Sequence, residues 1–242
     1  MYSLDFLVTT SCCDEYGRLK LYSALQMMQD CSEMWIDSEP VVKDYFKRSH
    51  MAQLLASRQV EILRMPQYRD RLHVETSVWE MKSMFGFRNT FIYDEAGRVC
   101  YRSWSQGAFV DSNTGHLAAV PDDVIASLHL DARKEMTYLG RHITLPEEKM
   151  YERPDVYVTN NDIDYNRHMN NANYVRIALE YLPQGFQPTG MRVEYKLPCR
   201  SGDCITPRSG LDRDRFYVEL SRRCRVCTVV EFTEQPVSVS GI

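Results

Sequence analysis

The sequence predicts an α+β fold built from two copies of one unit, in which a strand and a helix precede an antiparallel sheet. One long helical pattern is followed by a run of adjacent strand patterns, which is typical of this fold class. The same order of elements returns later in the chain. A length of 242 residues accommodates one large domain or two small ones.

The first copy begins with a strand pattern and a long amphipathic helix. The strand is expected over Leu4–Thr10, and Asp14–Gly17 form a turn. Apolar residues at helical spacing then run over Leu19–Trp35. Met27 and Met28 lie at the centre of this helix, where packing in the core is the simpler interpretation.

Four strand patterns follow this helix, which Pro40 is expected to end. They cover about Ala52–Arg64, Arg71–Ser83, Phe85–Tyr93 and Val99–Val110. A short helix is expected over Asp122–Leu130. The charged stretch 133–150 is interpreted as a linker, so the first unit covers residues 1–132 and the second covers 151–242.

A constant offset of 150 relates the two copies, and it pairs Asp14 with Asp164. Tyr16 and Arg18 of the first copy stand where the second copy has Asn166 and His168. Because tyrosine and arginine do not supply the same chemistry, we expect one catalytic site per chain. The first copy would supply a substrate wall and packing surface.

The second copy continues with four more strand patterns, at Thr189–Lys196, Asp203–Arg208, Arg215–Ser221 and Arg225–Thr233. Turns are expected at Ser201-Gly202 and at Ser209-Gly210. The tail from Gln235 is expected to be frayed.

Three polar residues at a spacing of two stand directly before the second helix pattern. They are Asp164, Asn166 and His168, and in an extended segment their side chains share one face. Asn170 or Asn171 is suited to cap the helix that follows. The sequence therefore predicts a carboxylate, an amide and an imidazole at the positive end of a helix.

This grouping suits general-base hydrolysis of an acyl compound. A helix N-terminus disfavours a protonated imidazole, so His168 would stay able to accept a proton. Asp164 would hold the ring in one tautomer, and Asn166 would position water or a carbonyl. Free N–H groups at the helix start would bind an oxyanion. The alternative is a polar turn with a capping asparagine and a surface histidine.

The stretch from Asp164 to Tyr174 resembles the signature of the acyl-acyl carrier protein thioesterases, Asp-x-Asn-x-His-(Val/Met)-Asn-Asn-x-x-Tyr. The residues that fall on this pattern are Asp164, Asn166, His168, Asn170, Asn171 and Tyr174. The resemblance implies two tandem hotdog units, each an antiparallel sheet wrapped around a long helix. The early start of the first strand pattern resembles bacterial members rather than plastid ones.

What the resemblance implies about function is hydrolysis of fatty acyl thioesters. The partner would be acyl carrier protein with its phosphopantetheine-linked fatty acyl chain. An acyl tunnel would run beside the first helix, where Met27 and Met28 would contact the substrate, as would Asn170 and Asn171 at the site. No metal or redox cofactor is needed, because a thioester is already activated.

The resemblance leaves the nucleophile open. Plant members carry Arg-Glu-Cys after a strand, whereas this sequence has Leu197-Pro198-Cys199 there. The glutamate with a catalytic role is replaced by Pro198, and the cysteine is kept. Either Cys199 attacks the thioester after activation by His168, or His168 activates water and Cys199 lines the site. We prefer the water route, because hydrolysing one thioester through another gains little activation.

Composition excludes several other classes. The net charge of −4 gives no general basic character for nucleic acid. No stretch approaches the ~20 apolar residues needed to span a bilayer. Eight irregularly placed cysteines fit reduced thiols in a cytosol, so we expect a cytoplasmic location. Cys224 and Cys227 form a CxxC without the second pair that a zinc site needs.

Some alternatives stay open at this point. The substrate could instead be an acyl-coenzyme A thioester, or the chain could be a non-catalytic acyl-binding module, although the intact polar trio argues against the latter. Whether the chain forms a homodimer is open. A cluster of arginines in the second half forms either a solvated face or a docking patch for an acidic carrier protein. Its members are Arg208, Arg213, Arg215, Arg222, Arg223 and Arg225.

Overall fold

The computed structural model describes residues 1–234, which form two compact units. The first comprises Met1–Ala56 and Ile62–Met136, and the second comprises Ser57–Glu61 and the chain from Thr137 onward. The expectation of a frayed tail from Gln235 lies outside the described residues.

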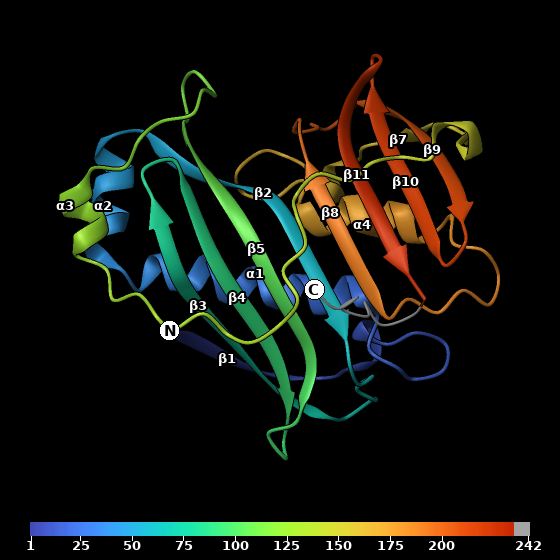
Figure 1. The fold of residues 1–242 in the computed structure, drawn as a ribbon, viewed down its shortest axis with the longest axis horizontal. Helices are drawn as coiled ribbons and strands as arrows, with labels where there is room; N and C mark the ends of the chain where they lie inside the picture. Colours follow the sequence, from blue (N-terminus) through green and yellow to red (C-terminus); the bar gives the residue numbers. More distant parts are fainter. Residues whose placement is uncertain (235–242) are drawn as a thin grey trace, which may run out of the picture. The chain divides into compact units, whose positions relative to one another are not determined.

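The first unit is an antiparallel sheet with a long helix on one face (Figure 1). Helix α1 (Leu21–Asp37) lies against three of its strands, β1, β3 and β4. The strand order is β1-β3-β4-β5-β2, with bounds β1 (Tyr2–Leu7), β2 (Met51–Ile62), β3 (Arg71–Lys82), β4 (Phe85–Asp94) and β5 (Val99–Asp111). The predicted α+β architecture is confirmed.

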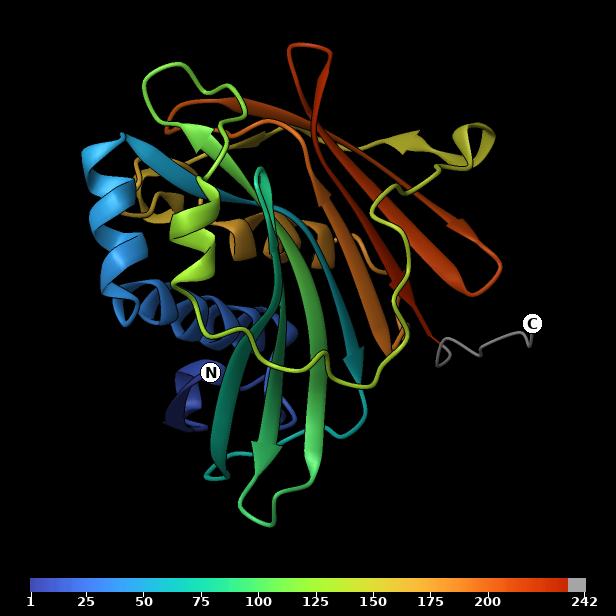
Figure 2. The same ribbon diagram turned by 60° about the vertical axis from the view of Figure 1, so that its left-hand side comes forward.

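Helix α1 forms where apolar residues recur at helical spacing, because that spacing places them on the side facing the sheet. Met28 and Trp35 are almost fully buried. Trp35 joins a core cluster with Phe46 of α2 (Pro40–Arg48) and Phe109 of β5. Figure 2 shows α2 beside the short α3 (Asp122–Ala126) at one end of this unit.

Pro40 does not end the first helix, contrary to the prediction. Helix α1 stops at Asp37, and Pro40 is the first residue of α2. Proline is accepted at the first helical position because its missing N–H would have no helical partner there. The proline therefore starts a helix rather than stopping one.

The second unit repeats this plan with shorter elements. Its helix α4 (Asn171–Leu179) has 9 residues, against 17 in α1, and packs on β11. Residues Ser57–Glu61 of β2 pair with β8. The order is β8-β11-β10-β9, with bounds β8 (Gly190–Tyr195), β9 (Cys204–Asp212), β10 (Arg215–Arg222) and β11 (Arg225–Thr233). The short strands β6 (Tyr151–Glu152) and β7 (Val156–Tyr157) pair with β9.

Ser209 and Gly210 do not form the predicted turn, because they lie inside β9 and pair with β10. A Cβ atom added at Gly210 would lie 2.2 Å from the carbonyl oxygen of Lys149. The glycine is therefore explained by a close backbone approach, which also favours glycine in strands.

The stretch 133–150 is packed against both sheets rather than lying free. In the first unit, Lys134 N donates to Asn89 Oδ1 at 3.1 Å. In the second unit, Gln59 Nε2 donates to Thr137 O at 2.8 Å, and Ile143 joins a cluster with Tyr217 and Val229. Each unit therefore has its own contacts with a part of this stretch.

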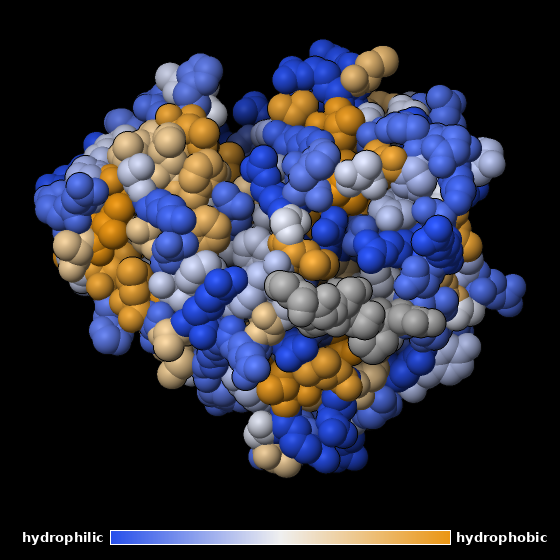
Figure 3. Space-filling model, viewed as in Figure 1, coloured by the Kyte–Doolittle hydropathy of each residue, from blue (hydrophilic) through white to orange (hydrophobic). Residues whose placement is uncertain are grey.

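Figure 3 shows a surface where hydrophilic and hydrophobic residues are mixed, with the hydrophilic ones predominating on that face. Among the helices that the structure describes, none combines the length and apolar character needed to cross a membrane.

Candidate active site

The segment Asp164–His168 is a tight turn, not the extended stretch that was predicted. Asp164 N donates to His168 O at 3.0 Å, and Arg167 N donates to Asp164 O at 2.9 Å. Arg167 has a φ of 64°, in the left-handed region. The spacing of two therefore does not place the three polar side chains on one strand face, since the backbone reverses between them.

The predicted helix cap is confirmed. Asn170 is the N-cap of α4, and its Oδ1 accepts a hydrogen bond from Ala172 N at 2.9 Å. The turn thus leads directly into the positive end of α4, and His168 stands just before the cap.

The carboxylate of Asp164 is bound within its own turn. Its Oδ1 accepts a hydrogen bond from Asn166 N at 2.9 Å. No hydrogen bond between this carboxylate and the His168 ring occurs among the described residues. The His168 Nε2 atom instead lies 3.5 Å from Nη2 of Arg200. The half-buried His168 and the exposed Asn166 are both placed where a ligand could reach them.

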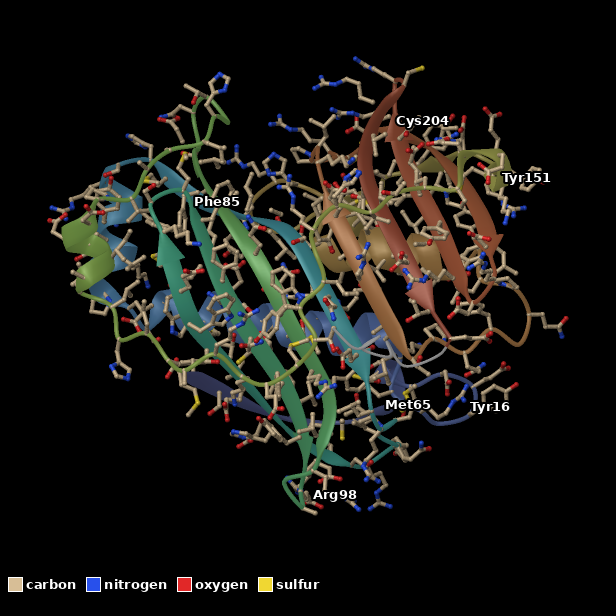
Figure 4. The ribbon with its side chains drawn as sticks, viewed as in Figure 1. Tyr16, Met65, Phe85, Arg98, Tyr151 and Cys204 are labelled. Atoms are coloured by element: carbon tan, nitrogen blue, oxygen red, sulfur yellow. The ribbon has the colours of Figure 1, made fainter. Side chains whose placement is uncertain are left out.

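The first copy contains the same turn with different side chains. Asp14 N donates to Arg18 O at 2.8 Å, Gly17 N donates to Asp14 O at 3.1 Å, and Gly17 takes the left-handed φ of 74°. There the carboxylate Oδ2 of Asp14 pairs with Arg18 Nε at 2.9 Å. Tyr16, which is 69% exposed, projects from this loop (Figure 4). The histidine position is therefore occupied by a permanently charged arginine.

A second loop, Cys199–Asp203, lies beside the turn. Met169 N donates to Cys199 O at 2.8 Å, and Arg200 N donates to Asp203 Oδ2 at 2.7 Å. Sequence reasoning missed that this loop brings Arg200 to His168. The sequence signal was a repeat at an offset of 133, which relates Asp70 to Asp203. The two loops close in the same way, since Gln67 N donates to Asp70 Oδ2 at 2.8 Å in the first copy.

Cys199 is fully buried. Its N–H donates to the hydroxyl of Tyr174 on α4 at 2.7 Å. A hydrogen bond from the Cys227 thiol is the main cause that lowers the pKa of Cys199 to about 7; burial opposes this, and Tyr174 and Arg222 assist it. The described residues show no hydrogen bond between the His168 ring and this sulfur. The structure therefore brings Cys199 next to the turn without forming a Cys–His pair.

The remaining predicted site residues are distributed as follows. Met27 and Met28 are buried on α1 in the first unit. Asn170 and Asn171 are half-buried at the start of α4. Within the part of the chain that the structure describes, no group of three or more His, Cys, Asp or Glu residues is arranged to hold a metal ion.

The arginines of the second half do not form one patch. Arg213 and Arg215 lie at the start of β10, whereas Arg222, Arg223 and Arg225 lie at its other end. A strand of this length spans roughly 25 Å. Only the second group is near the site, since Arg222 pairs with Asp203 of the neighbouring loop.

Three solved structures with this architecture are thioesterases. A protein of Lactobacillus plantarum described as an oleoyl thioesterase matches with a TM-score of 0.83 and 20% identity, over 97% of this chain and 96% of that one. An acyl-ACP thioesterase of Bacteroides thetaiotaomicron matches with a TM-score of 0.84 and 18% identity, over 96% of both chains. The 12:0-ACP thioesterase of Umbellularia californica matches with a TM-score of 0.81 and 16% identity, over 97% of both chains. The tandem hotdog fold is thereby confirmed.

The chain belongs to the acyl-ACP thioesterase family. Residues 1–128 match the acyl-ACP thioesterase N-terminal domain, and residues 146–223 match the C-terminal domain. An acyl-[acyl-carrier-protein] hydrolase of Cuphea viscosissima is 24% identical over 176 residues, covering 66% of this chain and 41% of that protein. An oleoyl-acyl carrier protein thioesterase of Arabidopsis thaliana is 23% identical over 175 residues, covering 66% of this chain and 48% of that protein. The match thus spans less than half the length of each of these two relatives.

Proposed function

We propose that this protein hydrolyses fatty acyl thioesters on acyl carrier protein, releasing free fatty acid and ending chain elongation. Membership of the family over both domains supports this substrate class. The observation that carries the proposal is the unequal repeat. Two turns share one backbone geometry, and only the second holds a histidine before a capped helix.

His168 acts as the general base in this proposal. It takes a proton from water while the water oxygen attacks the thioester carbonyl carbon. When the tetrahedral intermediate collapses, the C–S bond breaks and the phosphopantetheine sulfur leaves as a thiol, with the proton that His168 had taken. The side-chain amide of Asn166 orients the water or the carbonyl.

One backbone N–H at the start of α4 is a candidate oxyanion donor. Asn170 N donates to Asp162 O at 2.8 Å, and Asn173 N donates to Asn170 O at 2.9 Å. Ala172 N is bound by the cap. Among these first N–H groups of the helix, that of Asn171 has no hydrogen-bond acceptor among the residues that the structure describes. An N–H at the positive end of a helix stabilises a developing oxyanion.

Asp164 is proposed to orient the His168 ring during catalysis. Its Oδ1 is used by the turn, which leaves Oδ2 for the ring. The first copy supports this assignment, because Arg18 in the equivalent position reaches Asp14 Oδ2 at 2.9 Å. The His168 ring would exchange its contact with Arg200 for the carboxylate.

Acyl carrier protein is proposed to dock at the end of the second sheet where β10 meets β11. The basic residues there are Lys196, Arg200, Arg222, Arg223 and Arg225. Opposite charge accelerates association and fixes the register of an acidic partner. Charge reversal at Arg223 and Arg225 should raise KM for carrier-linked substrate, with little change for a neutral thioester of the same acyl chain.

The alternative substrate is acyl-coenzyme A, which the same chemistry would hydrolyse. Purified protein should be assayed with the same acyl chain on acyl carrier protein and on coenzyme A. We expect kcat/KM at least tenfold higher for the carrier-linked substrate. A preference for coenzyme A would contradict the proposed partner, and no turnover of either would favour a non-catalytic acyl-binding module.

We also propose a cytoplasmic location, which the eight free cysteines support. A homodimer stays a prediction that sedimentation measurements would test.

A further inference from the structure

Asp162 is hydrogen-bonded through all of its polar atoms. Its N donates to Thr159 O, and its carboxylate Oδ2 accepts from Thr159 N at 2.8 Å and Thr159 Oγ1 at 2.7 Å. Its Oδ1 accepts from Arg176 Nη2 at 2.7 Å. Its carbonyl oxygen accepts from Asn170 N at 2.8 Å and from Asn173 Nδ2 at 3.0 Å. With only 7% of its surface exposed, Asp162 is a fully satisfied buried acid.

These contacts connect the two ends of the loop that carries the proposed site. Thr159 precedes the loop, whereas Asn173 and Arg176 belong to α4, which follows it. Arg176 also donates from Nε to Asn173 Oδ1 at 3.2 Å. A planar guanidinium that binds two acceptors fixes direction as well as distance. We call Asp162, Asn173 and Arg176 the clamp.

The first copy has the same backbone closure without the clamp. Cys12 replaces Asp162, and its N donates to Thr9 O at 3.0 Å while its carbonyl accepts from Lys20 N at 2.9 Å. Gln26 replaces Arg176, and its amide donates to Tyr22 instead. Because the turn closes without these side chains, closing the turn does not require a clamp.

We propose that Asp162 and Arg176 are positioning residues that hold His168 for catalysis. This inference rests on the proposed function, because it assigns the clamp to the copy that holds the histidine. The clamp ties the loop to α4 through side chains, so the backbone that carries His168 and the N-terminus of α4 keep one relative placement. Orientation of this kind affects the rate of a reaction more than the binding of substrate.

The charge of Asp162 fits this role. Burial alone raises the pKa of Asp162, but hydrogen bonds from Thr159 and the charge of Arg176 outweigh it, so the pKa is lowered. The carboxylate therefore stays ionised at neutral pH and keeps Arg176 in place. The Thr159–Asp162 spacing is a capping-box pattern that the sequence itself contains.

The test converts the clamp to the composition of the first copy. The double variant Asp162→Cys/Arg176→Gln should stay folded and lose at least tenfold in kcat, with KM within threefold of wild type. Arg176→Lys, which keeps the charge but not the fork, should lose less than Arg176→Gln. The matched control is Cys12→Ala/Gln26→Ala in the first copy, which should leave both constants unchanged.

A purely structural role would lower thermal stability and leave kcat per folded molecule unchanged. That result in the folded double variant, or an equal loss in the control, would overturn the proposal. A second measurement is independent of activity, since NMR of the His168 ring should give shifted or broadened signals in the double variant. If wild type hydrolyses no thioester, the proposed function fails, and unshifted ring signals would then refute the clamp by themselves.

Discussion

Replacing Cys199 by alanine separates the two routes to hydrolysis. We expect Cys199→Ala to keep substantial activity and to accumulate no acyl-enzyme, because water is the preferred nucleophile. Cys199 is fully buried, and its sulfur has no hydrogen bond to the His168 ring among the described residues. A nucleophile would need both access to the thioester carbon and a base beside it.

The structure sets the size of the expected effect. The bond from Cys199 N to the Tyr174 hydroxyl, at 2.7 Å, involves only the main chain of Cys199, so it survives the substitution and holds the loop in place. Loss of a small buried side chain then costs about 1 kcal/mol of stability. A displaced wall residue would lower kcat by about tenfold or less, whereas loss of a nucleophile lowers kcat on the order of 10⁴- to 10⁶-fold.

Single-turnover assays with carrier-linked substrate and mass spectrometry of the quenched enzyme would measure both quantities. The pH profile adds a check. If the thiolate attacks, activity rises with pH through the pKa of Cys199, which is about 7, and this limb disappears in the alanine variant. An acyl group trapped on Cys199, together with loss of turnover in Cys199→Ala, would refute the water route.

Four further outcomes are expected. His168→Ala should abolish hydrolysis in a folded protein, whereas Arg18→Ala in the equivalent turn of the first copy should not. Measurement of kcat checks this, and an equal loss of kcat in both variants would contradict one catalytic site per chain. Met28→Trp, at a fully buried position of α1, should shift product chain length downward if this helix lines the acyl pocket, and an unchanged product profile would remove it from the pocket. Tyr174→Phe should lower the free energy of unfolding by about 1–3 kcal/mol, because it leaves the buried Cys199 N–H without an acceptor; chemical denaturation checks this. The lowered pKa of Asp162 contributes stability that is present above its ordinary value of 3.8 and is lost as pH falls through the folded-state pKa. Asp162→Asn should therefore be less stable than wild type at pH 7, and the difference should shrink in acid titrations of unfolding; a constant difference would refute the linkage.

Local features of the site could be predicted from residues that are adjacent in the sequence. Asn170 or Asn171 was predicted as the helix cap, because the short polar side chain of asparagine can accept a hydrogen bond from a free N–H at the start of a helix, and Asn170 is the cap. The turn at Asp14–Gly17 followed from a glycine that tolerates a left-handed φ, here 74°. The repeat at an offset of 150 also assigned the histidine to the second copy alone.

Long-range contacts decided what spacing could not. Asp164, Asn166 and His168 were expected on one face of a strand, but the hydrogen bonds that close the turn reverse the backbone between them. Gly210 signalled a turn by composition, but it pairs with Tyr217 of β10 inside β9, and the approach of Lys149 O explains why a glycine stands there.

The sequence by itself determined the order of elements, the repeat and the copy that carries the histidine, because these depend on residues adjacent in the chain. Only the tertiary structure decided that Arg200 lies at His168, that Cys199 is buried, and that Asp162 joins the loop to α4. Those contacts join residues that are far apart in sequence or depend on the backbone angles of a turn. Hydrophobic periodicity predicts local secondary structure and cannot predict either.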